Sequence, residues 1–163
     1  MAISAHLDLS AADAVWVATA LLHREHPRTK AFSVSEIVHR VAREQLTSRQ
    51  PTTIYQHANL HCVANRPPNK ARLCMLIETP DGLRRLYRRG DPTDPQRAGT
   101  RSLPERESLT TAYADLLAWY SRWEHKHAGD LSADPLEALI GTWTFGDADT
   151  YVRELREGWD ERP

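Results

Sequence analysis

Apolar positions in the first 64 residues recur with the period of an α-helix and predict three helices. The first lies over about 11–25 and is amphipathic. The second lies over about 34–46, where Ser33 and Glu36 have the spacing of a capping box. The third opens on Pro51, whose missing N–H costs nothing in a first helical turn, and continues to about residue 64.

After these helices the pattern changes to that of β-strands. A run of strand-compatible residues from Arg72 leads into Thr79-Pro80-Asp81-Gly82, which has the composition of a turn, and a return strand follows. Residues 72–88 are therefore predicted to form a β-hairpin. The next stretch, 91–101, contains several proline and glycine residues and is predicted to be a linker.

A longer amphipathic helix is predicted over 102–128, with Ser102 and Glu105 as its capping box. Its apolar residues follow the 4-3-4-3 spacing of a helix seam, namely Leu109, Tyr113, Leu116, Tyr120 and Trp123. Two tyrosines and one tryptophan give this seam a large apolar area. The seam therefore either packs on the first helix or pairs with the same helix of a second copy.

The remaining segment, 129–163, forms an acidic tail with three basic and nine acidic residues. Its apolar residues are separated by polar ones and predict short helices over about 135–141 and 148–158. The expected fold class is thus mainly α with a small β-hairpin, followed by a long helix and a short helical acidic tail. Such a tail cannot build its own core, but it can fold against a partner.

Charge is unevenly distributed along the 163 residues, although the net charge is only -1. Residues 31–90 carry ten basic and four acidic side chains, and residues 91–163 carry eight basic and fifteen acidic ones. A basic middle and an acidic end indicate two surfaces with different partners, and the basic surface suits a polyanion. The alternative is a globular protein with uneven solvated charge.

Three helices followed by a basic hairpin is the element order of a winged helix-turn-helix, here over about 5–90. Thr, Gln and Asn side chains on the third helix suit base edges in a DNA major groove, and arginines on the hairpin suit the phosphate backbone. The candidate DNA-binding residues are Arg49, Thr52, Thr53, Gln56, Asn59, Arg66, Lys70, Arg84 and Arg85. Alternatively, these residues are only the solvated face of a small domain.

Residues 31–90 resemble an uncharacterised bacterial winged-helix domain. The resemblance rests on Phe32-Ser33-Val34, on Thr53-Ile54 and above all on Cys62-Val63-Ala64-Asn65 before a basic hairpin. It implies binding of double-stranded DNA, without indicating which sequence is bound.

Residues 135–158 are similar to the toxin-binding tails of bacterial antitoxins that neutralise ribonuclease toxins of the PIN-domain type. The similarity rests on a leucine-rich turn, Gly141-Thr142-Trp143, an acidic step and a short helix with arginines. It implies apolar anchors at Leu139, Trp143, Tyr151 and Leu155, and an arginine, Arg153 or Arg156, that enters the acidic site of the toxin. A winged helix is less usual in such antitoxins. The alternative is that the segment packs on the chain's own helices.

Signatures of catalysis are absent from the sequence: it has no Walker A, dinucleotide-binding, nucleophile-elbow or H-E-x-x-H motif. His57, His61, Cys62 and Cys74 could ligate zinc, but the sequence has no C-x-x-C, and His61 and Cys62 are better explained by packing. We expect neither enzyme activity, cofactor nor metal. No apolar run is long enough to span a bilayer and no secretory signal opens the chain, so a cytoplasmic location is expected.

The sequence therefore predicts a DNA-binding transcriptional regulator that acts as an antitoxin, with a protein partner, a toxin, bound by the tail. A homodimer formed through the 102–128 helix is expected, because repressors commonly double their half-site contacts. An accessory or specificity module of a restriction or DNA-processing system is the alternative function. A small enzyme is the third possible function.

Overall fold

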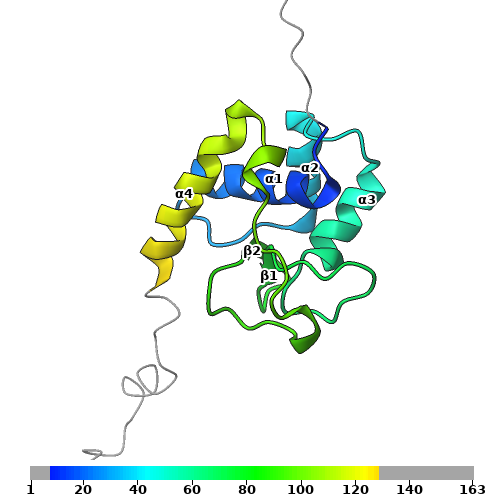
Figure 1. Cartoon of the computed structure of the whole chain (residues 1–163), viewed down its shortest axis with the longest axis vertical. Helices are drawn as coiled ribbons and strands as arrows, with labels where there is room; N and C mark the ends of the chain where they lie inside the picture. Colours follow the sequence, from blue (N-terminus) through cyan, green and yellow to red (C-terminus); the bar gives the residue numbers. More distant parts are fainter. Residues whose placement is uncertain (1–7, 129–163) are drawn as a thin grey trace, which may run out of the picture. The chain divides into compact units, whose positions relative to one another are not determined.

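Four α-helices and one two-stranded hairpin make up residues 8–128, the part of the chain that the computed structural model describes (Figure 1). The α-helices are α1 (Ala11–Glu25), α2 (Val34–Glu44), α3 (Pro51–Gln56) and α4 (Thr111–His127). The strands are β1 (Leu76–Glu78) and β2 (Arg84–Leu86). Short helical turns are η1 (His57–His61), η2 (Pro95–Arg97) and η3 (Arg106–Ser108). The expected fold class, mainly α with a small hairpin, is confirmed for these residues.

The first helix, α1, lies at the centre and contacts α2, α3, α4 and β2. Figure 1 shows α3 on one side of it and α4 on the other. Every residue of α1 from Ala11 to His23 is buried. The helix is therefore covered on all sides, and the prediction that it is amphipathic, with one face in solvent, is wrong. A helix in this position needs small or apolar residues all round. Ala14, Ala18 and Trp16 meet that need.

The second helix, α2, begins as its sequence predicts. The Ser33 hydroxyl accepts from the Glu36 N–H at 3.1 Å, and the Glu36 carboxylate accepts from the Ser33 N–H at 2.7 Å, which completes the capping box. The helix ends at Glu44 and is capped by Gln45, which adopts a left-handed conformation with φ 51°. Ile37 and Val41 lie on the buried face toward α1.

The hairpin is short and is joined by a third chain segment. Leu76 pairs with Leu86 and Glu78 pairs with Arg84 in an antiparallel register. Gly82 in the turn has φ 79°, a conformation that favours glycine. Phe32, between α1 and α2, forms a bridge to Arg84 with N···O distances of 2.7 and 2.8 Å in the two directions. The hairpin is thus anchored to the connection between the first two helices.

The stretch 91–101 is not the linker that its proline and glycine content predicts. Asp91 and Arg97 are buried, and the Cys74 N–H donates to the Arg101 carbonyl at 3.0 Å. Arg101 also forms an ion pair with the buried Asp13 carboxylate of α1, at 2.9 Å. These contacts tie the stretch to the rest of the fold. Helix α4 begins at Thr111 and not near Ser102, so the capping box predicted for Ser102 and Glu105 is wrong.

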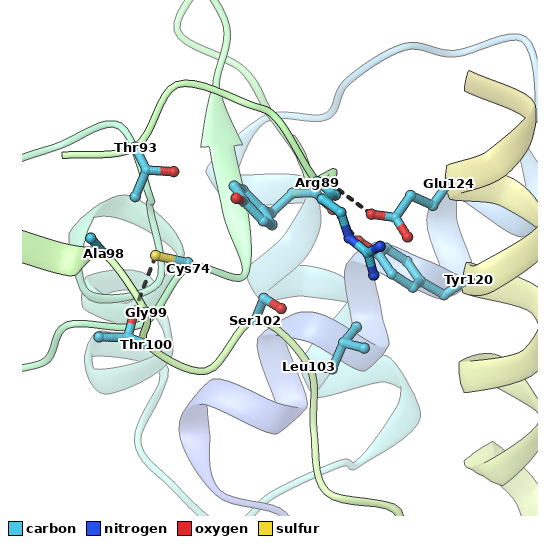
Figure 2. Close-up of a pocket in the computed structure, with 11 residues that line it drawn as sticks. Cys74, Arg89, Thr93, Ala98, Gly99, Thr100, Ser102, Leu103, Tyr120 and Glu124 are labelled. Carbon is cyan, nitrogen blue, oxygen red and sulfur yellow. Dashed lines mark hydrogen bonds between the residues drawn. The ribbon is translucent and has the colours of Figure 1, made fainter. Parts of the chain in front are cut away.

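The seam of α4 packs on the chain's own core. Leu116 and Tyr120 are buried, and the Tyr120 ring meets Trp16 of α1 edge-on with 5.7 Å between centroids. The Tyr120 hydroxyl donates to the Tyr87 carbonyl, and Glu124 accepts from the Arg89 N–H at 2.7 Å (Figure 2). The seam is therefore covered by α1, and the prediction that it pairs with a second copy is wrong for this face. None of the described helices is long and apolar enough to cross a membrane.

His23, on the last turn of α1, is a buried histidine among aromatic rings. Its ring lies 5.0 Å from that of Phe32 and 4.9 Å from that of Trp123, measured between centroids. The Leu86 N–H points at its Nε2 at 3.4 Å. Burial, followed by the positive charges of Arg88 and Arg85, lowers the pKa of His23 from 6.5 to about 3.

We predict that the unfolding free energy falls as the pH drops from about 6.5 toward 3, because the unfolded chain protonates His23 in this window and the folded chain does not. One such group contributes a slope of up to about 1.4 kcal/mol per pH unit. Urea unfolding at several pH values measures this pH dependence of the unfolding free energy. His23→Gln should flatten the slope, and His26→Gln, at an exposed position, should not. Equal slopes for both variants would contradict this explanation.

Candidate nucleic-acid interface

The N-terminal half of α3 has one face in the core and one face in solvent. Ile54 and Ala58 are buried, while Thr52, Tyr55 and Gln56 are exposed. Pro51 occupies the first turn, as its sequence position predicts. The exposed face therefore presents a hydroxyl, a phenol ring and an amide side by side along one helix.

Tyr55 is a residue that the sequence reasoning missed. Its side chain is 50% exposed, and among residues 8–128 it is the exposed large hydrophobic side chain. Tyrosine is common in protein cores, which is why composition does not single it out. The helical spacing could have found it, because residue 55 lies three positions after Thr52 and four before Asn59, on the same face.

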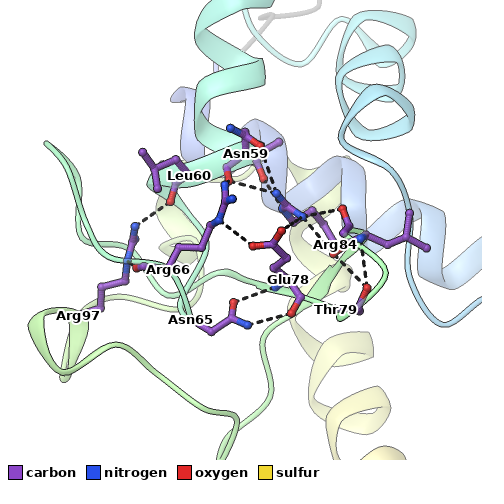
Figure 3. A network of polar contacts seen from close by, with 11 residues as sticks. Asn59, Leu60, Asn65, Arg66, Glu78, Thr79, Arg84 and Arg97 are labelled. Atoms are coloured by element: carbon purple, nitrogen blue, oxygen red, sulfur yellow. Dashed lines mark hydrogen bonds and ion pairs between the residues drawn. The ribbon is translucent and has the colours of Figure 1, made fainter.

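The C-terminal end of this helix is held by arginine side chains. The π-helical turn η1 continues α3, and the Cys62 N–H donates to the His57 carbonyl at 3.0 Å, five residues back. Carbonyl groups at the end of a helix lack intrahelical partners. Here the carbonyls of residues 58–61 accept hydrogen bonds from Arg66, Arg84 and Arg97 (Figure 3).

Arg97 is the most deeply buried of the three, with 0% of the residue exposed. Its Nη1 donates to the carbonyls of His61 and Leu73 at 2.7 Å each, and its Nη2 donates to the Leu60 carbonyl at 2.7 Å. Its Nε donates to the Arg66 carbonyl at 2.8 Å. Within the described residues no carboxylate forms an ion pair with it, and burial lowers its pKa.

Arg84 is also internal, and its prediction as a DNA contact is wrong. The residue is 2% exposed, its Nε donates to the Ala58 carbonyl at 3.1 Å, and its Nη2 donates to the Asn59 carbonyl and Oδ1 at 3.3 and 3.2 Å. Its Nη1 lies 3.4 Å from the Glu78 carboxylate. A guanidinium that is engaged on all sides in this way cannot reach a phosphate outside the protein.

Arg66 and Asn59 belong to the same network. The Arg66 Nη1 donates to the Asn59 carbonyl at 3.1 Å, and its Nε forms an ion pair with Glu78 at 2.7 Å. The Arg66 side chain is 37% exposed, so part of it faces solvent. The Asn59 amide oxygen is bound by Arg84, and a bidentate contact of this amide with adenine would have to replace that bond. These two predicted DNA contacts therefore have a structural role.

Arg85 is held by a buried partner rather than presented on a wing. Its two Nη atoms each lie 2.7 Å from an oxygen of Asp91, whose side chain is fully buried. The turn at 79–82 contains an exposed Asp81 and no basic residue. The expectation that Arg84 and Arg85 form a basic wing is therefore wrong, because both guanidinium groups bind partners within the protein.

The remaining predicted DNA contacts are at the surface around α3. Arg49 is exposed just before the helix, and Lys70 is exposed in the loop that follows it. Arg72 in the same loop is exposed as well and was not among the predicted residues. The exposed or half-buried polar residues of α3 and of the segments before and after it thus include Arg49, Thr52, Thr53, Tyr55, Gln56, Lys70 and Arg72. We call this set the α3 surface.

The histidines of the third helix lie close to Cys62 without forming a metal centre. The Cys62 Sγ lies 3.6 Å from the His57 Nδ1, and the His57 and His61 rings are 5.0 Å apart between centroids. Burial raises the pKa of Cys62 to about 12 and lowers the pKa of both histidines. In the described part of the chain no group of three or more His, Cys, Asp or Glu residues could hold a metal ion.

The predicted partner-binding residues lie outside the described part of the chain. They are Leu139, Trp143, Tyr151, Arg153, Leu155 and Arg156.

Comparison with protein-family models gives no match for this chain, and comparisons with curated proteins and with solved structures give none either.

We predict that Arg97→Ala lowers the unfolding free energy by about 3 kcal/mol or more, because several buried carbonyls lose their donors. Arg97→Lys should restore only part of the loss, since an ammonium lacks the planar fork that serves four carbonyls. Arg106→Ala, at an exposed position of η3, is the control and should change stability by less than about 0.5 kcal/mol. Urea unfolding measures all three, and equal stabilities of Arg97→Ala and Arg106→Ala would refute the role given to Arg97.

Proposed function

We propose that this protein is a DNA-binding regulator with a winged-helix type of fold, in which α3 is the reading helix. The order α1, α2, α3, β1 and β2 supports the proposal. The bridge from Phe32 to β2 gives further support, because it ties the hairpin to the connection between α1 and α2. The short, non-basic turn of the hairpin means that DNA contacts come from the α3 surface and not from a wing.

The observation that carries this proposal is the contrast between the two halves of the third helix. The carbonyl end is fixed by Arg66, Arg84 and Arg97, whereas the N-terminal half presents Thr52, Tyr55 and Gln56 to solvent. Recognition of base edges needs a helix that exposes one face and is held firmly, and this arrangement is consistent with both needs.

The chemistry of the exposed face favours A·T base pairs. An amide such as that of Gln56 bonds bidentately to adenine, while the Thr52 methyl group and the Tyr55 ring suit the thymine methyl group. Guanine is read mainly by arginine and lysine, and the sequence from 51 to 61 contains neither. Arg49 and Lys70 would contact phosphates and add affinity without sequence preference.

The proposed role of this DNA binding is that of a cytoplasmic antitoxin that represses its own operon. The acidic charge of 129–163 and its antitoxin-like pattern support a toxin partner, with Trp143 and Leu155 as anchors and Arg153 or Arg156 reaching acidic groups. An accessory DNA-binding module of a restriction or DNA-processing system is the alternative. For the alternative function the neighbouring gene would encode a nuclease or methyltransferase, whereas for an antitoxin it would encode a small ribonuclease.

The DNA proposal predicts that Gln56→Ala costs about 1–3 kcal/mol of binding free energy at a duplex selected by the wild-type protein from a randomised library. Gln96→Ala, an exposed glutamine on η2, is the matched control and should leave binding unchanged. Fluorescence anisotropy across a salt series measures both. Arg49→Ala should lower affinity for all sequences and reduce the salt slope by about 1. A protein that selects no duplex at low salt would refute DNA binding.

The same selected duplex allows a test of the thymine contact. Replacing its thymines by deoxyuridine removes only the C5 methyl groups from the major groove. We expect the wild-type protein to lose affinity on this replacement and the Tyr55→Ala variant to lose none. Equal losses for the two proteins would show that Tyr55 does not read the methyl groups, even where DNA binding itself is observed.

The antitoxin proposal predicts that a chain ending at Ala128 keeps its DNA binding and loses its protein partner. The full chain and the shortened chain would be co-expressed with the product of the neighbouring gene, and co-purification and growth would be followed. Trp143→Ala in the full chain should cost about 2 kcal/mol of partner binding or more if it is a central anchor. Loss of DNA binding together with a lower melting temperature in the shortened chain would assign the tail to the protein's own core.

A further inference from the structure

A pocket of about 440 Å³ lies between the segment that follows β2 and the C-terminal half of α4 (Figure 2). Its volume falls in the range of small-molecule sites, roughly 300–1,000 Å³. It is formed by residues far apart in the chain, from Cys74 at the start of the hairpin to Glu124 on α4. The DNA-binding proposal uses other residues and leaves this pocket without a role.

Two side chains of opposite charge line the pocket, Arg89 and Glu124. One oxygen of the Glu124 carboxylate accepts from the backbone N–H of Arg89 at 2.7 Å, which fixes the carboxylate at the pocket. Within the described residues no hydrogen bond or ion pair holds the Arg89 guanidinium. Figure 2 shows both side chains at one end of the pocket, near Tyr120. The pocket therefore offers a cation and an anion that do not neutralise each other by direct contact.

The rest of the lining carries no charge. Leu103 and Ala98 contribute apolar surface, as do the rings of Tyr87 and Tyr120. The Tyr120 hydroxyl is occupied by the Tyr87 carbonyl, and burial raises its pKa, so it stays neutral. At the other end the Cys74 Sγ donates to the Arg97 carbonyl at 3.3 Å. A ligand would thus meet charges at one end and an uncharged lining beyond them.

We propose that this pocket binds a free α-amino acid with an apolar side chain. Its carboxylate would bind the Arg89 guanidinium, its ammonium group would bind the Glu124 carboxylate, and its side chain would extend along Leu103. A ligand that carries only a negative charge can bind Arg89 but is repelled by the Glu124 carboxylate. A ligand that carries only a positive charge can bind Glu124 but is repelled by the Arg89 guanidinium. A zwitterion satisfies both groups, and each contact is a charge-assisted hydrogen bond.

The test uses the full chain and isothermal titration calorimetry with L-leucine and L-phenylalanine as probes. The comparison compounds are 4-methylpentanoate, which is leucine without its amino group, and 3-methylbutylamine, which is leucine without its carboxylate. We expect at least one amino acid to bind with a dissociation constant below about 1 mM, and leucine to bind about tenfold more tightly than either comparison compound. Absence of binding up to about 10 mM for both amino acids, or equal binding of leucine and its two analogues, would overturn the proposal.

Variants assign the binding to this pocket. Arg89→Gln and Glu124→Gln should each weaken amino-acid binding by about tenfold or more, since each removes one charged contact. Glu124→Gln keeps an oxygen that can accept from the Arg89 N–H, and Arg89→Gln breaks no side-chain contact in the described part of the chain, so both are compatible with folding. Arg122→Gln and Glu107→Gln, at exposed positions outside the pocket, are the controls and should bind as the wild type does. Wild-type affinity in Arg89→Gln would refute the site. None of these measurements involves DNA, so their outcome is independent of the DNA-binding proposal.

Discussion

The structure depends on a buried arginine that is held by backbone carbonyls. Removing a guanidinium from water is costly unless its donors are satisfied. For Arg97 the compensation comes from the carbonyls of Leu60 and His61 at the end of η1, together with those of Arg66 and Leu73. The C-terminal end of a helix carries partial negative charge, which adds to this compensation. One side chain thus connects the third helix, the loop after it, the entry to the hairpin and η2.

Buried arginines also account for part of the positive charge in the middle of the sequence. Residues 31–90 have a net charge of +6, from ten basic and four acidic side chains, but part of it lies inside the protein. Arg84 caps the helix end, Arg85 neutralises the buried Asp91, and Arg40 pairs with Glu25 and Glu44. A charge count along the chain therefore overstates the charge that a polyanion would meet. What remains near α3 is confined to a few side chains before and after the helix.

Several features that depend on neighbouring residues were predictable from the sequence, although the local capping pattern at Ser102 and Glu105 did not begin a helix. Features that depend on distant residues were not predictable. The capping box at Ser33, the proline that opens α3 and the glycine turn of the hairpin are local, and the structure has all three. The burial of α1 on every side and the packing of 91–101 depend on contacts with distant segments. Arg97 is the clearest case, because its partners are backbone carbonyl groups. Every residue carries such a group, so no pattern of side chains in the sequence indicates which ones bind Arg97.

The segment from 91 to 103 also determines how the two proposed sites relate to each other. Arg97 reaches the end of the third helix from this segment, and the Thr100 hydroxyl, on the wall of the pocket, donates to the Arg97 carbonyl at 2.7 Å. A loop fixed by buried hydrogen bonds at both points does not act as a hinge, because movement at either point would leave polar groups unpaired. The segment is therefore attached to the core through Arg97 and Asp91, although most of its other residues are exposed or half-buried. It contacts the end of the proposed reading helix through Arg97 and lines the proposed pocket through Ala98, Thr100 and Leu103.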